Sequence, residues 1–75
     1  MELFERVVLL NDLTGTKFIK GDVATVVEIY NRGEGYEIEF FAADGTTLGV
    51  ESVAADAVKS CKGIKGVFHI HNIVA

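Results

Sequence analysis

The sequence lacks proline, contains a single cysteine and has no apolar run as long as the roughly 18 to 20 residues that a membrane helix needs. One cysteine, Cys61, cannot form an internal disulfide, so the core must hold without covalent help, as expected in a reducing cytoplasm. The first residues, MELFERVVLL, place an acid where a secretory signal carries basic residues. These absences predict a cytoplasmic protein without membrane contact.

The absence of proline also leaves strand edges without their usual protection against pairing between chains. A chain of 75 residues is one domain, and a domain this small buries only about 60% of its unfolded surface. Self-association would add buried surface. A homo-oligomer, formed through an exposed strand edge or through the C-terminal tail, is therefore expected.

Basic residues are scarce in the first 58 residues, where Arg6, Lys17, Lys20 and Arg32 stand against all eleven acids. Residues 59–75 reverse this balance with three lysines and no acid. An acidic body repels phosphate backbones and attracts cationic protein surfaces. The charge distribution disfavours nucleic acid and favours a basic protein partner.

Alternating apolar and polar residues dominate the stretch from Lys20 to Val50, with breaks after Asn31 and at Asp44-Gly45. This pattern predicts three antiparallel strands joined by two short turns, which is half of a small barrel. A two-residue hairpin with positive φ at both positions is expected at Asp44-Gly45. Before it, residues 5–10 suit a first strand, and after it residues 53–58 suit a single helical turn.

The alternation also predicts which residues face the core. Tyr36, Ile38 and Phe40 give the clearest set, and Leu48 and Val50 are expected to point inward from the fourth strand. In the second strand the favoured core face is Val23, Thr25, Val27 and Ile29. The opposite face contains Glu28, which is costly to bury unpaired.

Two segments remain less determined. In the first strand, either Val7 and Leu9 or Val8 and Leu10 point inward, and both faces are covered if a second surface meets the strand. The long loop of residues 11–20 is expected to anchor to the core through Leu13, Phe18 and Ile19, and Gly21 is expected to take a positive φ.

Three motifs, KGDVATVVEIY from Lys20, YEIEF from Tyr36 and DGT from Asp44, occur in an order that resembles domain of unknown function 4926, a family of very short bacterial proteins. The opening VVLLNDL from Val7 fits the start of that family, and the resemblance covers about residues 4–58. Ala24 stands where the family usually has glycine, and the tail after Lys59 lies outside the pattern.

The resemblance implies an all-β, SH3-like small barrel of about five strands and no assigned reaction or cofactor. We therefore expect residues 1–58 to form the barrel and residues 59–75 to form a C-terminal extension, a loop plus a final strand. Some family members are similar to components encoded beside proposed toxins. That similarity suggests an antitoxin-like or immunity-like role.

Protein binding is the expected function, through an acidic surface opposite the core. Its residues are Glu28, Tyr30, Glu37, Glu39 and Phe41, with Glu51 as a further candidate. Phe41 cannot share the face of Phe40, so it is either exposed or covered by another element. Carboxylates interleaved with aromatic anchors suit a basic protein partner. No reaction is indicated, and the protein is expected not to be an enzyme.

Three alternatives compete with this interpretation. His69 and His71 project from one face of a strand and could bind a metal if Cys61 or Asp56 completed the site. Cys61 paired with either histidine could act as a nucleophile, although the spacing matches no known signature. A small RNA-binding barrel would have to use Arg32 and the lysines of the tail, because glutamates occupy the central strands.

Overall fold

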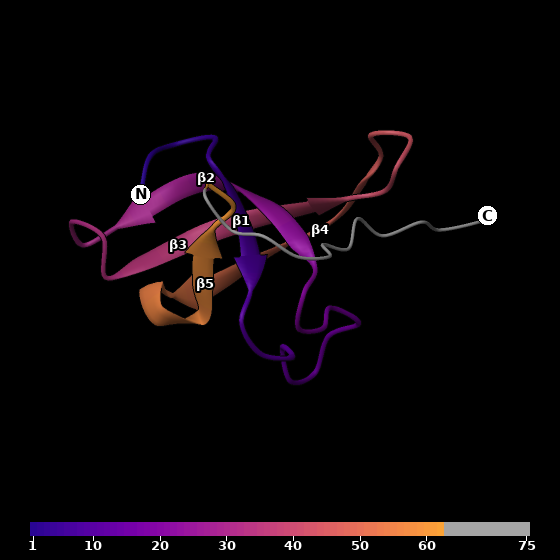
Figure 1. Cartoon of the computed structure of the whole chain (residues 1–75), viewed down its shortest axis with the longest axis horizontal. Helices are drawn as coiled ribbons and strands as arrows, with labels where there is room; N and C mark the ends of the chain where they lie inside the picture. The colour runs from indigo at the N-terminus through magenta and orange to yellow at the C-terminus, as the bar shows by residue number, and fades with distance from the viewer. Residues whose placement is uncertain (63–75) are drawn as a thin grey trace.

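A computed structural model describes residues 1–62 of the chain as five antiparallel strands in one curved sheet (Figure 1). The elements are β1 (Arg6–Leu9), β2 (Val23–Tyr30), β3 (Gly35–Phe41), β4 (Thr47–Ala54), the 3-10 turn η1 (Ala55–Ala57) and β5 (Val58–Ser60). The strand order is β4-β3-β2-β1-β5, so the last strand returns to pair with the first. The fold is all-β, as predicted, and consistent with an SH3-like small barrel. Within the described residues, no helix has the length and apolar character of a membrane span.

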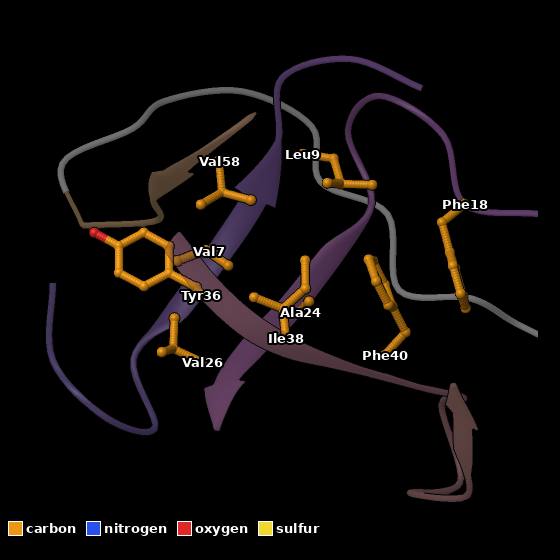
Figure 2. Close-up of a cluster of buried hydrophobic side chains, with 9 residues drawn as sticks. All are labelled: Val7, Leu9, Phe18, Ala24, Val26, Tyr36, Ile38, Phe40 and Val58. Atoms are coloured by element: carbon orange, nitrogen blue, oxygen red, sulfur yellow. The ribbon is translucent and has the colours of Figure 1, made fainter. Parts of the chain in front are cut away.

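The core lies on one side of β3, where the predicted alternation is confirmed. Tyr36, Ile38 and Phe40 are all buried, while the residues between them are partly exposed. Figure 2 shows these side chains among the buried residues of β1, β2 and β5. Phe18, from the β1–β2 loop, stacks on Phe40 with ring centroids 3.8 Å apart and planes inclined by 9°. The loop therefore closes one end of the core.

Strand β1 resolves the choice that its sequence leaves open. Val7 and Leu9 belong to the core cluster, whereas Leu10 is exposed. Val8, on the opposite face of the strand, is also buried. Both faces of β1 are thus covered, which explains its run of consecutive apolar residues.

The predicted core face of β2 is wrong in the first half of the strand, although Val23 itself is buried, beside its cross-strand partner Val8 on the other face. Ala24 and Val26 lie in the core cluster, and Thr25 lies on the outer face opposite Glu39. The pairing with β3 shifts between Val26 and Glu28, so Val27 forms a β-bulge. A bulge adds one residue and reverses the alternation beyond it, so Ile29 packs against the core as predicted.

The predicted inward pair of β4, Leu48 and Val50, is only half right, because the pairing of β3 with β4 contains a second register shift. Phe40 pairs with Gly49 and Phe41 with Thr47, which leaves Leu48 as the extra residue between them. Leu48 packs against the core as expected, but Val50 lies on the outer face and is 44% exposed. The bulge, which a strict period of two cannot anticipate, reverses the phase of the strand.

The loop between β1 and β2 is held by polar groups as well as by Phe18. Asp22 is buried, and its carboxylate accepts a hydrogen bond from the Ile19 backbone at 2.8 Å. Gly21 has the expected positive φ, +94°. The expected anchor Leu13 packs against the core, but Ile19 is 49% exposed, so its prediction as an anchor is wrong. The buried residue at the end of the loop is instead the polar Asp22, which holds the Ile19 backbone.

The β3–β4 hairpin differs from its predicted form. Ala42 donates to the Thr46 carbonyl at 2.8 Å, and Gly45 donates to the Ala42 carbonyl at 2.9 Å. Within this hairpin, only Gly45 has positive φ, +89°. The loop therefore contains Ala43, Asp44 and Gly45, with glycine in the left-handed position that closes such a hairpin.

The 3-10 turn predicted after β4 is present at Ala55–Ala57. Strand β5 then continues to Ser60, beyond the expected boundary of the barrel at residue 58, and pairs with β1 through Val7↔Ser60 and Leu9↔Val58. The final strand expected further along the tail lies outside the described residues.

Candidate protein-interaction surface

The strand register brings three carboxylates onto the outer surface of β2 and β3. Glu28 is the direct cross-strand partner of Glu37, and Glu39 follows two positions later on the same face as Glu37. We call this surface, with Tyr30 beside it on β2, the acidic face. Because directly paired residues of an antiparallel sheet project to the same side, the glutamates share one surface.

Among residues 1–62, neither Glu37 nor Glu39 has a cation as a cross-strand partner. The cross-strand partners of Glu37 are Glu28 and Ser52, and those of Glu39 are Thr25 and Val50. Like charges placed directly opposite one another destabilise a sheet. The acidic face therefore carries an electrostatic cost that its own strands do not offset.

Hydroxyl groups hold two of the carboxylates in place. The Tyr30 hydroxyl donates to Glu37 Oε2 at 3.0 Å, and the Thr47 hydroxyl donates to Glu39 Oε2 at 2.6 Å. The bond to Glu37 raises the pKa of Tyr30, because the carboxylate stabilises the protonated phenol and its charge opposes the phenolate. Fixed carboxylates lose little side-chain freedom when a ligand binds.

Apolar surface lies beside the charges. Tyr30 is 40% exposed, and the exposed side chain of Val50 lies next to Glu39 on the same face. Strand β2 contributes Tyr30, as the sequence predicts. Val50 was not predicted there, because the bulge at Leu48 conceals its orientation, and no signal in the alternation reveals that bulge.

Phe41 lies on the outer face but is not an open anchor. It is partly buried, and the guanidinium of Arg6 sits 5.3 Å from the centroid of its ring. An arginine over an aromatic face makes a favourable cation–π contact. Of the two alternatives for Phe41, partial cover is the one observed, and Arg6 contributes to it.

Glu51 does not belong to the acidic face. Its cross-strand partner is Ile38, whose side chain is buried in the core, so Glu51 projects from the opposite side of the sheet to Glu37 and Glu39. The candidate surface thus contains Glu28, Glu37, Glu39, Tyr30 and Val50, with Phe41 and Arg6 at its border.

The other candidate sites are less complete. Cys61 is partly buried, and this burial raises the pKa of its thiol, so the reactive thiolate is a smaller fraction at neutral pH. His69 and His71 lie outside the described residues. Within residues 1–62, no three side chains of histidine, cysteine, aspartate or glutamate form a group that could hold a metal ion.

Comparison with known proteins gives one result. No curated protein and no solved structure shows significant similarity to the chain. A family model, described as Domain of unknown function (DUF4926), matches residues 3–60, from the N-terminal turn to the last residue of β5. The matched region is the whole five-stranded sheet, and the chain therefore belongs to the DUF4926 family.

Proposed function

We propose that this protein is a small, non-enzymatic, cytoplasmic interaction module whose acidic face binds a basic protein partner. The observation that supports this proposal is the direct opposition of Glu28 and Glu37 on neighbouring strands. A role as an antitoxin-like or immunity-like neutraliser of a basic protein fits the same surface.

The arrangement of charges favours a cationic ligand. Lysine or arginine side chains placed between Glu28, Glu37 and Glu39 would replace repulsion by attraction, so binding would gain from both changes. Because Tyr30 and Thr47 already orient two of the carboxylates, little additional ordering is required.

A protein suits this surface better than a nucleic acid does. Carboxylates repel phosphates, and the exposed side chains of Tyr30 and Val50 offer apolar contact area between the charges. Single-stranded RNA would require cations beside its stacking platforms. On the acidic face, the aromatic side chain of Tyr30 instead donates to a carboxylate.

The absence of catalysis is part of the proposal and has its own test. The raised pKa of Cys61 opposes the thiolate that a cysteine nucleophile needs. Alkylation of the full chain by iodoacetamide at neutral pH should be slower than alkylation of an unstructured cysteine peptide. Faster alkylation would indicate an activated thiol and would contradict a purely binding role.

The binding proposal can be tested with two variants of equal net charge. The double variant Glu28→Gln, Glu37→Gln removes two charges from the acidic face and keeps an acceptor for the Tyr30 hydroxyl. The control, Glu34→Gln with Asp56→Asn, removes two exposed charges from the β2–β3 turn and from η1. Wild type and both variants would be immobilised and exposed to extract of the source cells.

A basic protein retained by wild type and by the control, but lost with the first variant, is the expected result. Equal loss with both variants would reflect net charge alone and would contradict a defined site. Filter binding of RNA at low and moderate salt tests the alternative, because phosphate contacts weaken steeply as salt rises. Salt-sensitive retention of RNA by wild type would favour the RNA-binding function instead.

A further inference from the structure

The N-terminal turn, residues 2–5, has an unusual residue at its third position. The Glu5 backbone donates to the Glu2 carbonyl at 3.2 Å, and Phe4 has a φ of +65°. A turn with positive φ at this position normally uses glycine, because a side chain there is strained. A hydrogen bond holds the strained turn against β2, because the Phe4 backbone donates to the Val26 carbonyl at 2.6 Å.

The strained turn presents apolar side chains to solvent. Phe4 is 73% exposed, Leu3 is 50% exposed and Met1 is 43% exposed. Leu3 and Phe4 also line an open depression of about 450 Å³ between the N-terminal turn and the end of β5. Against residues 1–62, Phe4 therefore gains little burial in return for its backbone strain, which points to a further contact.

The charges around the depression identify the kind of partner. Its lining includes two acids, Glu2 and Glu5, and two cations, Arg6 and Lys62. Glu5 is fixed by accepting a hydrogen bond from the Glu2 backbone at 3.0 Å, and its bond with Ser60 lowers its pKa. A partner with charges of one sign would be attracted by one pair and repelled by the other.

A second copy of this chain matches such a surface. In a two-fold symmetric interface the same patch meets itself, so a patch with both signs of charge can place each acid against a cation of the other copy. The exposed apolar residues then supply the centre of the contact and the charges supply its border. A small domain with limited core also gains most from added burial.

We propose that two copies of this chain associate through the N-terminal turn, with Leu3 and Phe4 at the centre of a two-fold interface bordered by Glu2, Glu5, Arg6 and Lys62. This interface shares Arg6 with the border of the acidic face, but its central residues lie outside that face, and the proposal does not depend on the function proposed for the acidic face.

The variant Phe4→Gly should weaken dimerisation without destabilising the fold. Glycine removes the apolar side chain but adopts positive φ without strain, so the fold should be at least as stable as wild type. Sedimentation of the full chain over a concentration series should show a dimer for wild type and a dissociation constant raised at least tenfold for the variant. Thermal unfolding at low concentration should show no loss in the unfolding temperature.

Two control variants locate the contact. Ile19→Ser removes an apolar side chain from the β1–β2 loop, and Val50→Ser removes one from the acidic face. The exposed fractions of these side chains, 49% and 44%, are close to the 50% of Leu3. Neither variant should change the dissociation constant. Loss of the dimer with Val50→Ser and not with Phe4→Gly would place the contact on the sheet and overturn the proposal. A wild-type chain that stays monomeric at every concentration would overturn it as well.

Charge reversal tests the symmetry of the interface. Glu2→Lys leaves one acid against three cations in the patch, and Lys62→Glu leaves one cation against three acids. Each variant alone should dimerise more weakly than wild type, because like charges then meet across the two-fold axis. An equimolar mixture should form a mixed dimer more strongly than either variant forms its own. If the mixture associates no more strongly than either variant alone, the two-fold arrangement is wrong.

Discussion

The two faces of the β2–β3–β4 sheet are built from opposite kinds of interaction. On the inner face, Ile38 and Phe40 are fully buried, and Phe40 stacks on Phe18. On the outer face, Glu28 and Glu37 are cross-strand partners, and hydroxyl groups donate hydrogen bonds to the carboxylates of Glu37 and Glu39. Both faces belong to the same strands and share the same backbone hydrogen bonds.

This contrast separates the face that stabilises the fold from the face that we propose binds a partner. The inner face stabilises the fold by burying apolar surface, a gain of about 25 cal/mol for each Å² removed from water. The outer face lowers stability through repulsion between its charges and presents them to solvent. Substitutions on the inner face should therefore destabilise the fold, and a substitution that removes charge from the outer face should stabilise it.

Truncation of Phe40 gives the largest expected effect. Phe40→Ala removes a fully buried ring and its stacking contact with Phe18, and comparable truncations cost about 3–5 kcal/mol of unfolding free energy. Phe41→Ala, the adjacent residue on the outer face, is the matched control and should cost less than half as much. Urea unfolding of both variants measures the difference. Similar losses for the two variants would mean that the faces are not distinct.

The β-bulge in β2 predicts the next largest effect. Val26→Thr places a hydroxyl in the fully buried core, where an unpaired polar group costs about 1–3 kcal/mol. Val27→Thr makes the same chemical change at the bulged, partly exposed position and should be close to neutral. Urea unfolding again measures both. A greater loss of unfolding free energy for Val27→Thr than for Val26→Thr would show that Val27 faces the core, as the sequence alternation suggests, and that β2 contains no bulge at this point.

The bulges also explain how far the sequence could predict this fold. The first four strands and the helical turn follow from local patterns, and the inward set of β3 follows from a strict period of two. Strand β5 does not, because its three residues, Val58–Ser60, carry no strand pattern of their own and are defined by their pairing with β1. The inner residues of β2 and β4 follow only in part, with Ile29 and Leu48 predicted correctly, because each strand contains one extra residue whose position depends on the pairing with β3. The sequence of one strand alone does not reveal that dependence.

The same limit applies to the candidate site. Glu37 and Glu39 were placed correctly because β3 is regular where they occur. Glu28 was also placed correctly, since the bulge at Val27 precedes it and the alternation holds from there to Tyr30. Val50 and the cover of Phe41 by Arg6 depend on pairings between distant segments, and the local pattern contains no trace of them.

Removal of the repulsion on the outer face should raise stability slightly. Glu28→Gln keeps the size of the side chain and removes the like-charge pair with Glu37, so unfolding free energy should rise by about 0.2–1 kcal/mol. Glu34→Gln, in the β2–β3 turn, is the control and should change little. The gain should shrink at high salt, where surface charges are screened. A destabilised Glu28→Gln would show that the pair carries no cost.

The smallest expected effect is a change in the titration of Tyr30. Its pKa lies above the ordinary value of 10.0, first because of the hydrogen bond to Glu37 and then because of partial desolvation and the charge of that carboxylate. With the folded pKa raised, the folded chain holds the phenol proton more tightly than the unfolded chain. This contribution to stability is therefore complete below pH 10.0 and is lost as the pH rises through the folded pKa.

In Glu37→Gln the amide can still accept the hydrogen bond but carries no charge, so the pKa of Tyr30 should move down toward 10.0. Ring NMR signals of Tyr30, followed through an alkaline titration of wild type and variant, measure the shift, and Glu39→Gln on the same strand should leave it nearly unchanged. A Tyr30 midpoint that is the same in wild type and Glu37→Gln would mean that the hydroxyl and the carboxylate do not interact in solution, and that the acidic face is less ordered than the contact implies.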